Sequence, residues 1–269
     1  MKIIDFHTHI FPDNLAGKAL RSIESTGGIK PKFDGTLKGL INSMDNAGVS
    51  ISVVLSIATK PKQFNSIFNW ARSIYSERII PFPSVHPDDE EVHQHILQIK
   101  SEGFKGLKMH PYFQGFYIDE ERMFPIYETI AKAGLILVIH AGYDFAYERI
   151  EKAGPWRILR IMKEFPELHL VAAHLGGWQQ WDIVEKLLIG KNLFIDTSFS
   201  QDFLEESQFT RMILKHHSEM ILFGTDTPWR EQKDAVQKLK KLAIPEDIKS
   251  KIFYQNAAKL LTTGTTADS

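Results

Sequence analysis

Short apolar runs alternate with amphipathic segments along the whole chain. The run ISVVLSI at 51–57 and the nearly all-apolar run at 135–140 are two examples. Runs of this length that are rich in Val, Ile and Leu are typical of strands buried on both faces. We expect strands at 3–9, 51–57, 79–85, 106–110, 135–140, 168–174, 192–197 and 220–226.

Apolar residues at helical spacing fill the intervals between these strands. Leu37, Leu40, Ile41 and Met44 follow the i, i+3, i+4, i+7 pattern of an amphipathic helix, which we expect to end at Gly48. The same reasoning predicts helices at 13–27, 61–76, 89–102, 119–132, 155–165, 181–189 and around 209–213. Two further helical segments are expected after residue 226.

Eight strands that are each followed by a helix indicate a (β/α)8 barrel, also called a TIM barrel. The length of 269 residues suits one such domain. An open doubly wound sheet is the rival architecture, but no G-x-G-x-x-G motif follows the first strand. No shift in composition marks a domain boundary, so we expect one barrel over 1–261 and a flexible tail over 262–269.

Composition and charge exclude several classes of protein. The chain is 43% hydrophobic and 24% charged, with a formal net charge of -1, so no strong field attracts nucleic acid or an anionic membrane. No apolar stretch is long enough to span a membrane, and the N-terminus lacks the apolar segment of a signal peptide. There is no cysteine, so any metal ligands must be histidines and carboxylates. We expect a cytoplasmic protein.

Candidate chemistry gathers where the predicted strands end, which is where barrel enzymes place their active sites. The first strand ends in Asp5-Phe6-His7-Thr8-His9. Because side chains two apart in a strand share a face, we expect Asp5, His7 and His9 on one face, and Phe6 and Thr8 on the other. Two neutral imidazoles on one face can bind one divalent ion.

Other titratable residues end later strands. These residues are Lys108, His110, His140, His174 and Asp226. A single histidine at a strand end is more often a hydrogen-bonded structural residue than a ligand. His86 follows the third strand as well. The other five histidines lie elsewhere: we expect His93 and His95 to face solvent, and His169, His216 and His217 lie at the wrong end of their strands. This segregation favours a metal site in the barrel.

Four motifs, in this order, resemble those of the amidohydrolase superfamily, most closely its amidohydrolase-2 (amidohydrolase-related) branch. They are IDFHTH at 4–9, HAG at 140–142, AHLGG at 173–177 and FGTDTPW at 223–229. The resemblance implies a distorted (β/α)8 barrel with one or two divalent metals, zinc first and manganese, nickel or cobalt as alternatives. It also implies metal ligands at His7, His9, His140 and Asp226.

The resemblance further implies catalytic roles for two residues. Asp226 would accept a proton from a water activated by the metal, and His174 would be a catalytic acid or base, or a ligand of a second metal. Lys108 would bridge two metals if it is carboxylated. As a free cation it would instead hold a substrate carboxylate, or it would point away from the site toward the helices.

Substrate-binding candidates follow from position alone. His110 shares the face of Lys108, and Tyr143, Trp178 and Trp229 lie just after predicted strand ends, on loops that would surround the barrel mouth. An aromatic rim of this kind suits a planar or apolar small molecule. We therefore expect a small-molecule substrate and no nucleic-acid or membrane partner; self-association into a homo-oligomer is compatible with the fold.

Several functions compete. The leading hypothesis is a metal-dependent hydrolase that attacks an amide, ester, lactone or related carbonyl bond. The alternative is a nonoxidative decarboxylase, whose known members commonly carry a large insertion that this chain lacks. Polymerase-and-histidinol-phosphatase domains share the first motif but continue differently, and TatD-type deoxyribonucleases carry a carboxylate where this chain has Lys108. A barrel that binds without turnover should have lost at least one ligand position, and none is lost.

Overall fold

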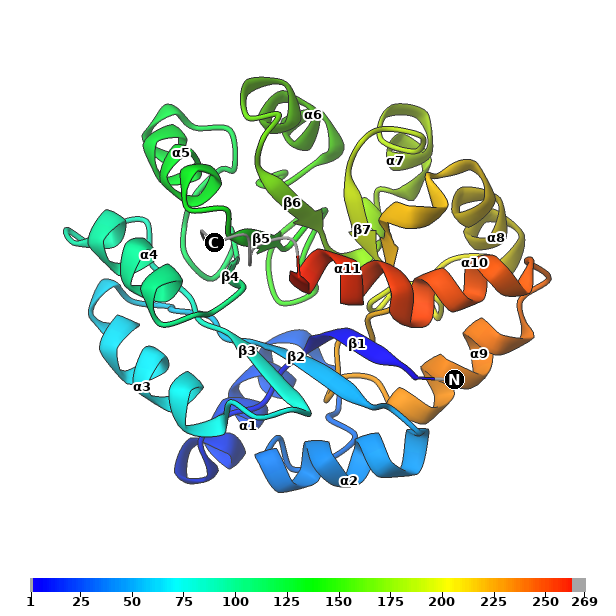
Figure 1. The fold of residues 1–269 in the computed structure, drawn as a ribbon, viewed down its shortest axis with the longest axis horizontal. Coiled ribbons are helices and arrows are strands. Elements are labelled where there is room, and N and C mark those ends of the chain that lie inside the picture. Colours follow the sequence, from blue (N-terminus) through cyan, green and yellow to red (C-terminus); the bar gives the residue numbers. More distant parts are fainter. Residues whose placement is uncertain (1, 263–269) are drawn as a thin grey trace, which may run out of the picture.

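The computed structural model describes residues 2–262, which form a closed barrel of parallel strands surrounded by helices (Figure 1). The predicted (β/α)8 fold is confirmed. The strands are β1 (Ile4–Thr8), β2 (Ile51–Leu55), β3 (Ile79–Phe82), β4 (Gly106–Met109), β5 (Ile136–Ile139), β6 (His169–Ala172), β7 (Phe194–Asp196) and β8 (Ile221–Leu222). The tail predicted over 262–269 lies outside the described residues apart from Thr262, which ends the last helix.

The helices follow the predicted alternation, with one addition at each end of the chain. They are α1 (Asp13–Gly27), α2 (Leu37–Ala47), α3 (Phe64–Ile74), α4 (Val92–Ser101), α5 (Phe124–Lys132), α6 (Pro155–Glu164), α7 (Trp181–Leu187), α8 (Glu206–Lys215), α9 (Gln232–Lys241), α10 (Glu246–Ser250) and α11 (Asn256–Thr262). Short helical turns are η1 (Pro61–Gln63), η2 (Glu121–Met123), η3 (His174–Gly176), η4 (Ser218–Met220) and the π-helical η5 (Lys251–Gln255).

Local sequence signals set several of these boundaries. The hydroxyl of Thr36 accepts a hydrogen bond from the Gly39 N–H and caps the start of α2. Gly48 ends the same helix with φ of 71°, a left-handed conformation that favours glycine. Two helical segments close the chain, as predicted: α9 is the first, and α10, η5 and α11 run without a break as the second.

Two seams divide the barrel. Continuous pairing runs through β1, β2 and β3, and separately from β4 to β8. Backbone hydrogen bonds outside the continuous pairing join the two groups. At one seam the Lys108 N–H donates to the Pro83 carbonyl at 2.9 Å. At the other, N–H groups of Phe6, Asp226 and His9 donate to the carbonyls of Phe223, His7 and Thr227 at 2.8, 2.8 and 2.6 Å. The barrel is therefore closed but irregular, as the resemblance implied.

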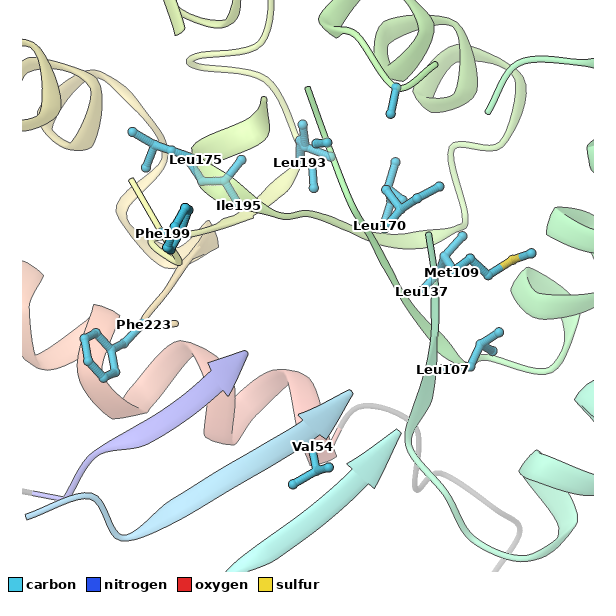
Figure 2. Packing of buried hydrophobic residues seen from close by; sticks show 14 of the residues in the cluster. Val54, Leu107, Met109, Leu137, Leu170, Leu175, Leu193, Ile195, Phe199 and Phe223 are labelled. Atoms are coloured by element: carbon cyan, nitrogen blue, oxygen red, sulfur yellow. The ribbon is translucent and has the colours of Figure 1, made fainter. Parts of the chain in front are cut away.

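The core has two parts, one on each side of the strands. Outward side chains such as Leu107, Leu137 and Leu170 pack in the cluster beneath the helices (Figure 2). Inward side chains such as Phe6, Val53 and Val138 form a second cluster with Leu260 and Leu261 of α11. Helix α11 thus closes one end of the barrel, and the site lies toward the other end, after the strands.

No helix in the described part of the chain is long and apolar enough to cross a membrane.

Candidate active site

A cavity of about 350 Å³ opens at the carboxyl ends of the strands. The titratable residues of its lining come from five different strand ends, as expected for a barrel enzyme. They are His7, His9, Lys108, His110, His140, Asp144, His174 and Asp226. Residues 7 and 226 are far apart in the sequence, and the barrel topology brings them together.

The first strand reaches this cavity through a β-bulge. Pairing with β2 shifts register between Asp5 and Thr8. Phe6 consequently points into the barrel cluster, while His7 and His9 line the cavity. The expectation that Asp5 shares a face with the two histidines was wrong, because a bulge inserts an extra residue and shifts the alternation of side chains.

Asp5 instead ties β1 to the segment after β8. Its carboxylate accepts hydrogen bonds from the Thr225 backbone N–H at 3.0 Å, from the Thr225 hydroxyl at 2.6 Å and from Gln232 Nε2 at 2.8 Å. Complete burial raises the pKa of Asp5 to about 7, against the opposing effect of these hydrogen bonds. Its role is to position the neighbouring histidines.

His7, His9 and Asp226 converge on one point. His7 Nε2 lies 3.2 Å from His9 Nε2, and Asp226 Oδ1 lies 3.4 Å from the first nitrogen and 3.2 Å from the second. All three ligand atoms lie within 4.8 Å of one another. Three ligand atoms at this spacing could hold a single ion.

The other ring nitrogen of each histidine is already engaged. His9 Nδ1 lies 2.8 Å from the Leu55 carbonyl, which can only accept, so Nδ1 carries the proton. His7 Nδ1 lies 2.8 Å from Asp196 Oδ2, and burial lowers the pKa of His7 well below its ordinary value. Two Nε2 lone pairs and a carboxylate oxygen therefore face one another, and a divalent cation fits between them.

Asp226 is suited to hold such a cation. Burial raises the pKa of this carboxyl, but the close approach of the His9 ring and the neighbouring basic groups outweigh burial and lower the pKa overall. The backbone of Asp226 has φ of 67°, in the left-handed region. A residue other than glycine held there is strained, which often marks a functional position.

Sequence analysis did not identify Asp196, although it ends the seventh apolar strand. Besides contacting His7, it accepts hydrogen bonds from the backbone N–H groups of His174 and Ser198, both at 3.0 Å. Its position after Phe194 and Ile195, with the period of a strand, was the available signal. Asp196 therefore orients one ligand and fixes the backbone of His174.

His140 and His174 form a second facing pair. His140 Nε2 lies 2.8 Å from the Tyr143 carbonyl and must donate, which leaves Nδ1 as an acceptor 3.0 Å from His174 Nε2. Burial lowers the pKa of both imidazoles well below the ordinary value. The structure thus places His140 beside His174. The ligand atoms of His140 group with those of His110 and Asp144, and not with those of His7, His9 and Asp226.

Lys108 is a buried cation that lines the cavity. It is 1% exposed, and its Nζ has no hydrogen-bond partner among the described residues. Burial lowers its pKa to about 8, against the attraction of Asp196, Asp226 and Asp144. An unpaired buried ammonium is costly, so the site calls for an anion at this point.

A third group lies on the far side of His140. His110 stacks on His140 with ring centroids 4.2 Å apart, and His110 Nε2 lies 3.4 Å from Asp144 Oδ2. Burial raises the pKa of Asp144. Sequence reasoning missed Asp144, because it lies four residues beyond the predicted strand, in an irregular segment.

The predicted aromatic positions divide. Trp178 and Trp229 line the cavity together with His110, whereas Tyr143 is not among the lining residues and faces the site only through its carbonyl.

One expectation about the other histidines was wrong. His95 is largely covered, because it stacks on Phe64 and bonds to Asp89.

Comparisons with solved structures agree with this fold. The chain resembles an uncharacterised TIM-barrel protein from Bordetella bronchiseptica at 19% identity, covering 98% of this chain and 99% of the other, with a TM-score of 0.77. It also resembles 2,6-dihydroxybenzoate decarboxylase from Rhizobium, at 17% identity over 98% and 99% of the chains, with a TM-score of 0.68. At these identities, the likeness shows the fold alone.

A third solved relative contains a metal. This 5-carboxyvanillate decarboxylase from Novosphingobium aromaticivorans has bound manganese and is 16% identical over 97% of each chain, with a TM-score of 0.70. No curated protein matches the chain.

The family comparison is direct. The family model described as Amidohydrolase, Amidohydro_2, matches residues 4–262, which confirms the family expected from the four motifs. A divalent metal is consistent with both that family and the converging ligands described above. The chain therefore belongs to the Amidohydro_2 family of amidohydrolases.

Proposed function

We propose that this protein is a metal-dependent carboxy-lyase that removes CO₂ from a small aromatic carboxylic acid. The observation that carries the proposal is Lys108, a buried ammonium without a partner among the described residues, in a cavity that also holds a candidate metal site. A substrate carboxylate supplies the missing anion. Two of the solved relatives named above are decarboxylases of aromatic acids, which supports this choice.

His7, His9 and Asp226 would hold the metal. When bound, a divalent ion supplies Lewis acidity and stabilises negative charge that develops on substrate oxygen. The histidine-rich set suits zinc, and manganese is the metal bound in the Novosphingobium decarboxylase. His140 and His174 provide two further nitrogens, which could hold a second ion.

Decarboxylation breaks the bond between the ring carbon and the carboxyl group. The electron pair stays on the carbon, CO₂ leaves and the carbon takes a proton. We assign the delivery of this proton to His174 and to Asp226, which would first accept it from water; both side chains line the cavity. Lys108 orients the carboxylate, and the indole rings of Trp178 and Trp229 offer apolar surface to the ring.

Hydrolysis is the second candidate, and the protonation state of Asp226 favours it. This carboxyl has a lowered pKa and lies beside two ligand nitrogens, so it is ionised and can accept a proton from water. The bond attacked would then be an amide, ester or lactone.

Isotope labelling separates the two reactions. The manganese- or zinc-loaded protein is incubated with hydroxybenzoates in D₂O, and a carboxy-lyase yields CO₂ and a product with one deuterium at the vacated carbon. Lactones and aryl esters are tested in H₂¹⁸O, where a hydrolase places ¹⁸O in the product acid. The proposal requires the first result; ¹⁸O incorporation without CO₂ would replace it with hydrolysis.

Asp226→Asn is the variant that tests the site in either case. It should abolish turnover, whereas Asp182→Asn, a change at an exposed residue of α7, should leave turnover intact.

A further inference from the structure

The cavity continues from its polar lining into an apolar compartment bounded by α1 and α3. Leu15, Ala19 and Ile23 of α1 line this part, as do Ile67 and Trp70 of α3. In Figure 1, α1 lies between α2 and α3. Helix α1 is additional to the strand–helix alternation, because α2 also lies between β1 and β2.

Each of these helices carries two apolar stripes. The buried side chains of Ala16 and Leu20 pack α1 against the rest of the protein. The cavity-lining stripe of Leu15, Ala19 and Ile23 runs along the adjacent face of the same helix. Helix α3 is likewise anchored by Phe64, Phe68, Ala71 and Ile74, which leaves Ile67 and Trp70 for the cavity. Ile23 and Trp70 of the second stripe also touch the core, but they stay only partly buried.

This second stripe remains accessible. Leu15 is 50% exposed, and Ala19, Ile23, Ile67 and Trp70 are only partly buried. Apolar side chains held open beside an active site lose the stabilisation that burial would give them, and a ligand can restore it.

The far end of α1 is fixed across the cavity mouth. The ring of Phe145, from the loop after β5, lies so close to Gly27 that a Cβ there would come within 2.1 Å of it. Phe145 also lines the cavity. Helix α1 therefore reaches from the end of β1 to the β5 side and encloses the compartment.

We propose that the substrate is an amphipathic carboxylic acid whose apolar part extends beyond a single ring. This inference rests on the proposed function for the position of the carboxylate, near Lys108 and the metal ligands. The substituent lies between the Leu15–Ala19–Ile23 stripe and the Ile67–Trp70 stripe. A cavity of about 350 Å³ is within the range that takes ligands beyond a single ring.

The test measures binding, so it does not depend on turnover. Benzoates with a 4-methyl, 4-butyl or 4-hexyl group are titrated calorimetrically into the metal-loaded protein. Each added methylene should tighten Kd by about fourfold until the compartment is filled, with one ligand per chain. Affinity that does not rise with alkyl length would overturn the proposal.

Matched variants locate the effect. Ile67→Asp should flatten the dependence of Kd on alkyl length. Leu97→Asp places the same charge on α4, at a residue that is 56% exposed and not among the cavity-lining residues, and should change nothing. An equal length dependence in Ile67→Asp and the parent would also overturn the proposal.

A series of 4-alkylphenols separates this inference from the function beneath it. The phenols lack the carboxylate, so they should bind more weakly but with the same dependence on alkyl length. If benzoates hold no advantage over phenols, the carboxylate site fails and the apolar compartment stands. If the advantage persists without any length dependence, the compartment fails and the carboxylate site stands.

Discussion

His7 Nδ1 donates a 2.8 Å hydrogen bond to Asp196 Oδ2, and this pair links the first strand of the barrel to the seventh. The bond turns the Nε2 lone pair of His7 toward His9 and Asp226. Partners of this kind typically change metal affinity by 10- to 100-fold.

Asp196→Asn should therefore weaken metal binding by roughly 10- to 100-fold, because an amide holds His7 less firmly in the required tautomer. Competition with a fluorescent chelator measures the affinity. Asp182→Asn serves as the control. An unchanged affinity in Asp196→Asn would contradict the assigned role.

Asp226→Asn should lower kcat by at least about 100-fold while the protein stays folded. The amide keeps the size of the side chain but cannot accept a proton. Circular dichroism and thermal unfolding establish that the fold persists, and steady-state kinetics on the substrate found by labelling give the rate. Retained activity would remove Asp226 from the mechanism.

Lys108→Met should stabilise the metal-free protein by about 3 kcal/mol at pH 7, because the native protein holds a buried ammonium whose pKa is lowered from 10.5 to about 8. Between these two pH values the unfolded chain binds more protons than the folded one, so the native protein gains stability as pH rises. The gain in the free energy of unfolding from Lys108→Met is thus largest below about pH 8 and vanishes near pH 10.5.

Urea unfolding of both proteins across this range measures the difference. A constant difference from pH 7 to pH 10.5 would show that Lys108 is not the titrating group. The same variant should lose affinity for benzoate, since the anion loses its counter-charge.

Gly142→Ala should destabilise the protein by about 3 kcal/mol and disturb the position of Trp178. Gly142 has φ of 83°, and a Cβ would lie 2.1 Å from the Trp178 backbone nitrogen. Gly115→Ala is the matched control: its φ is 70° with open space around the Cβ position, so it should cost only about 1 kcal/mol. Equal losses would mean that backbone strain alone accounts for the effect.

The sequence was sufficient to predict the order of strands and helices, because buried strands and amphipathic helices have distinct periods. It also placed His7, His9, Lys108, His174 and Asp226 at strand ends, and the structure puts all of them on one cavity. These positions follow from the parallel topology alone.

Features that depend on local irregularity were beyond reach. The bulge in β1 reverses the expected faces of Asp5 and Phe6, and nothing in the residue pattern marks its position. Asp144 lies in an irregular loop, and the direction of the His140 ring depends on a carbonyl three residues away. Helix α1 was predicted, but its place across the cavity mouth results from its contact with Phe145.

The two seams of the barrel would give the proposed metal ligands a mechanical role. His7 and His9 belong to the group β1–β3, whereas Asp226 follows β8 in the other group, and continuous strand pairing does not extend between the groups, although backbone hydrogen bonds cross the seam. An ion held by all three side chains is a cross-link between the two ends of the chain, comparable to a disulfide that closes a very long loop. Removing the ion should remove this cross-link. The barrel should then open first along the β8–β1 seam, and backbone amide hydrogen exchange should rise there before it rises elsewhere.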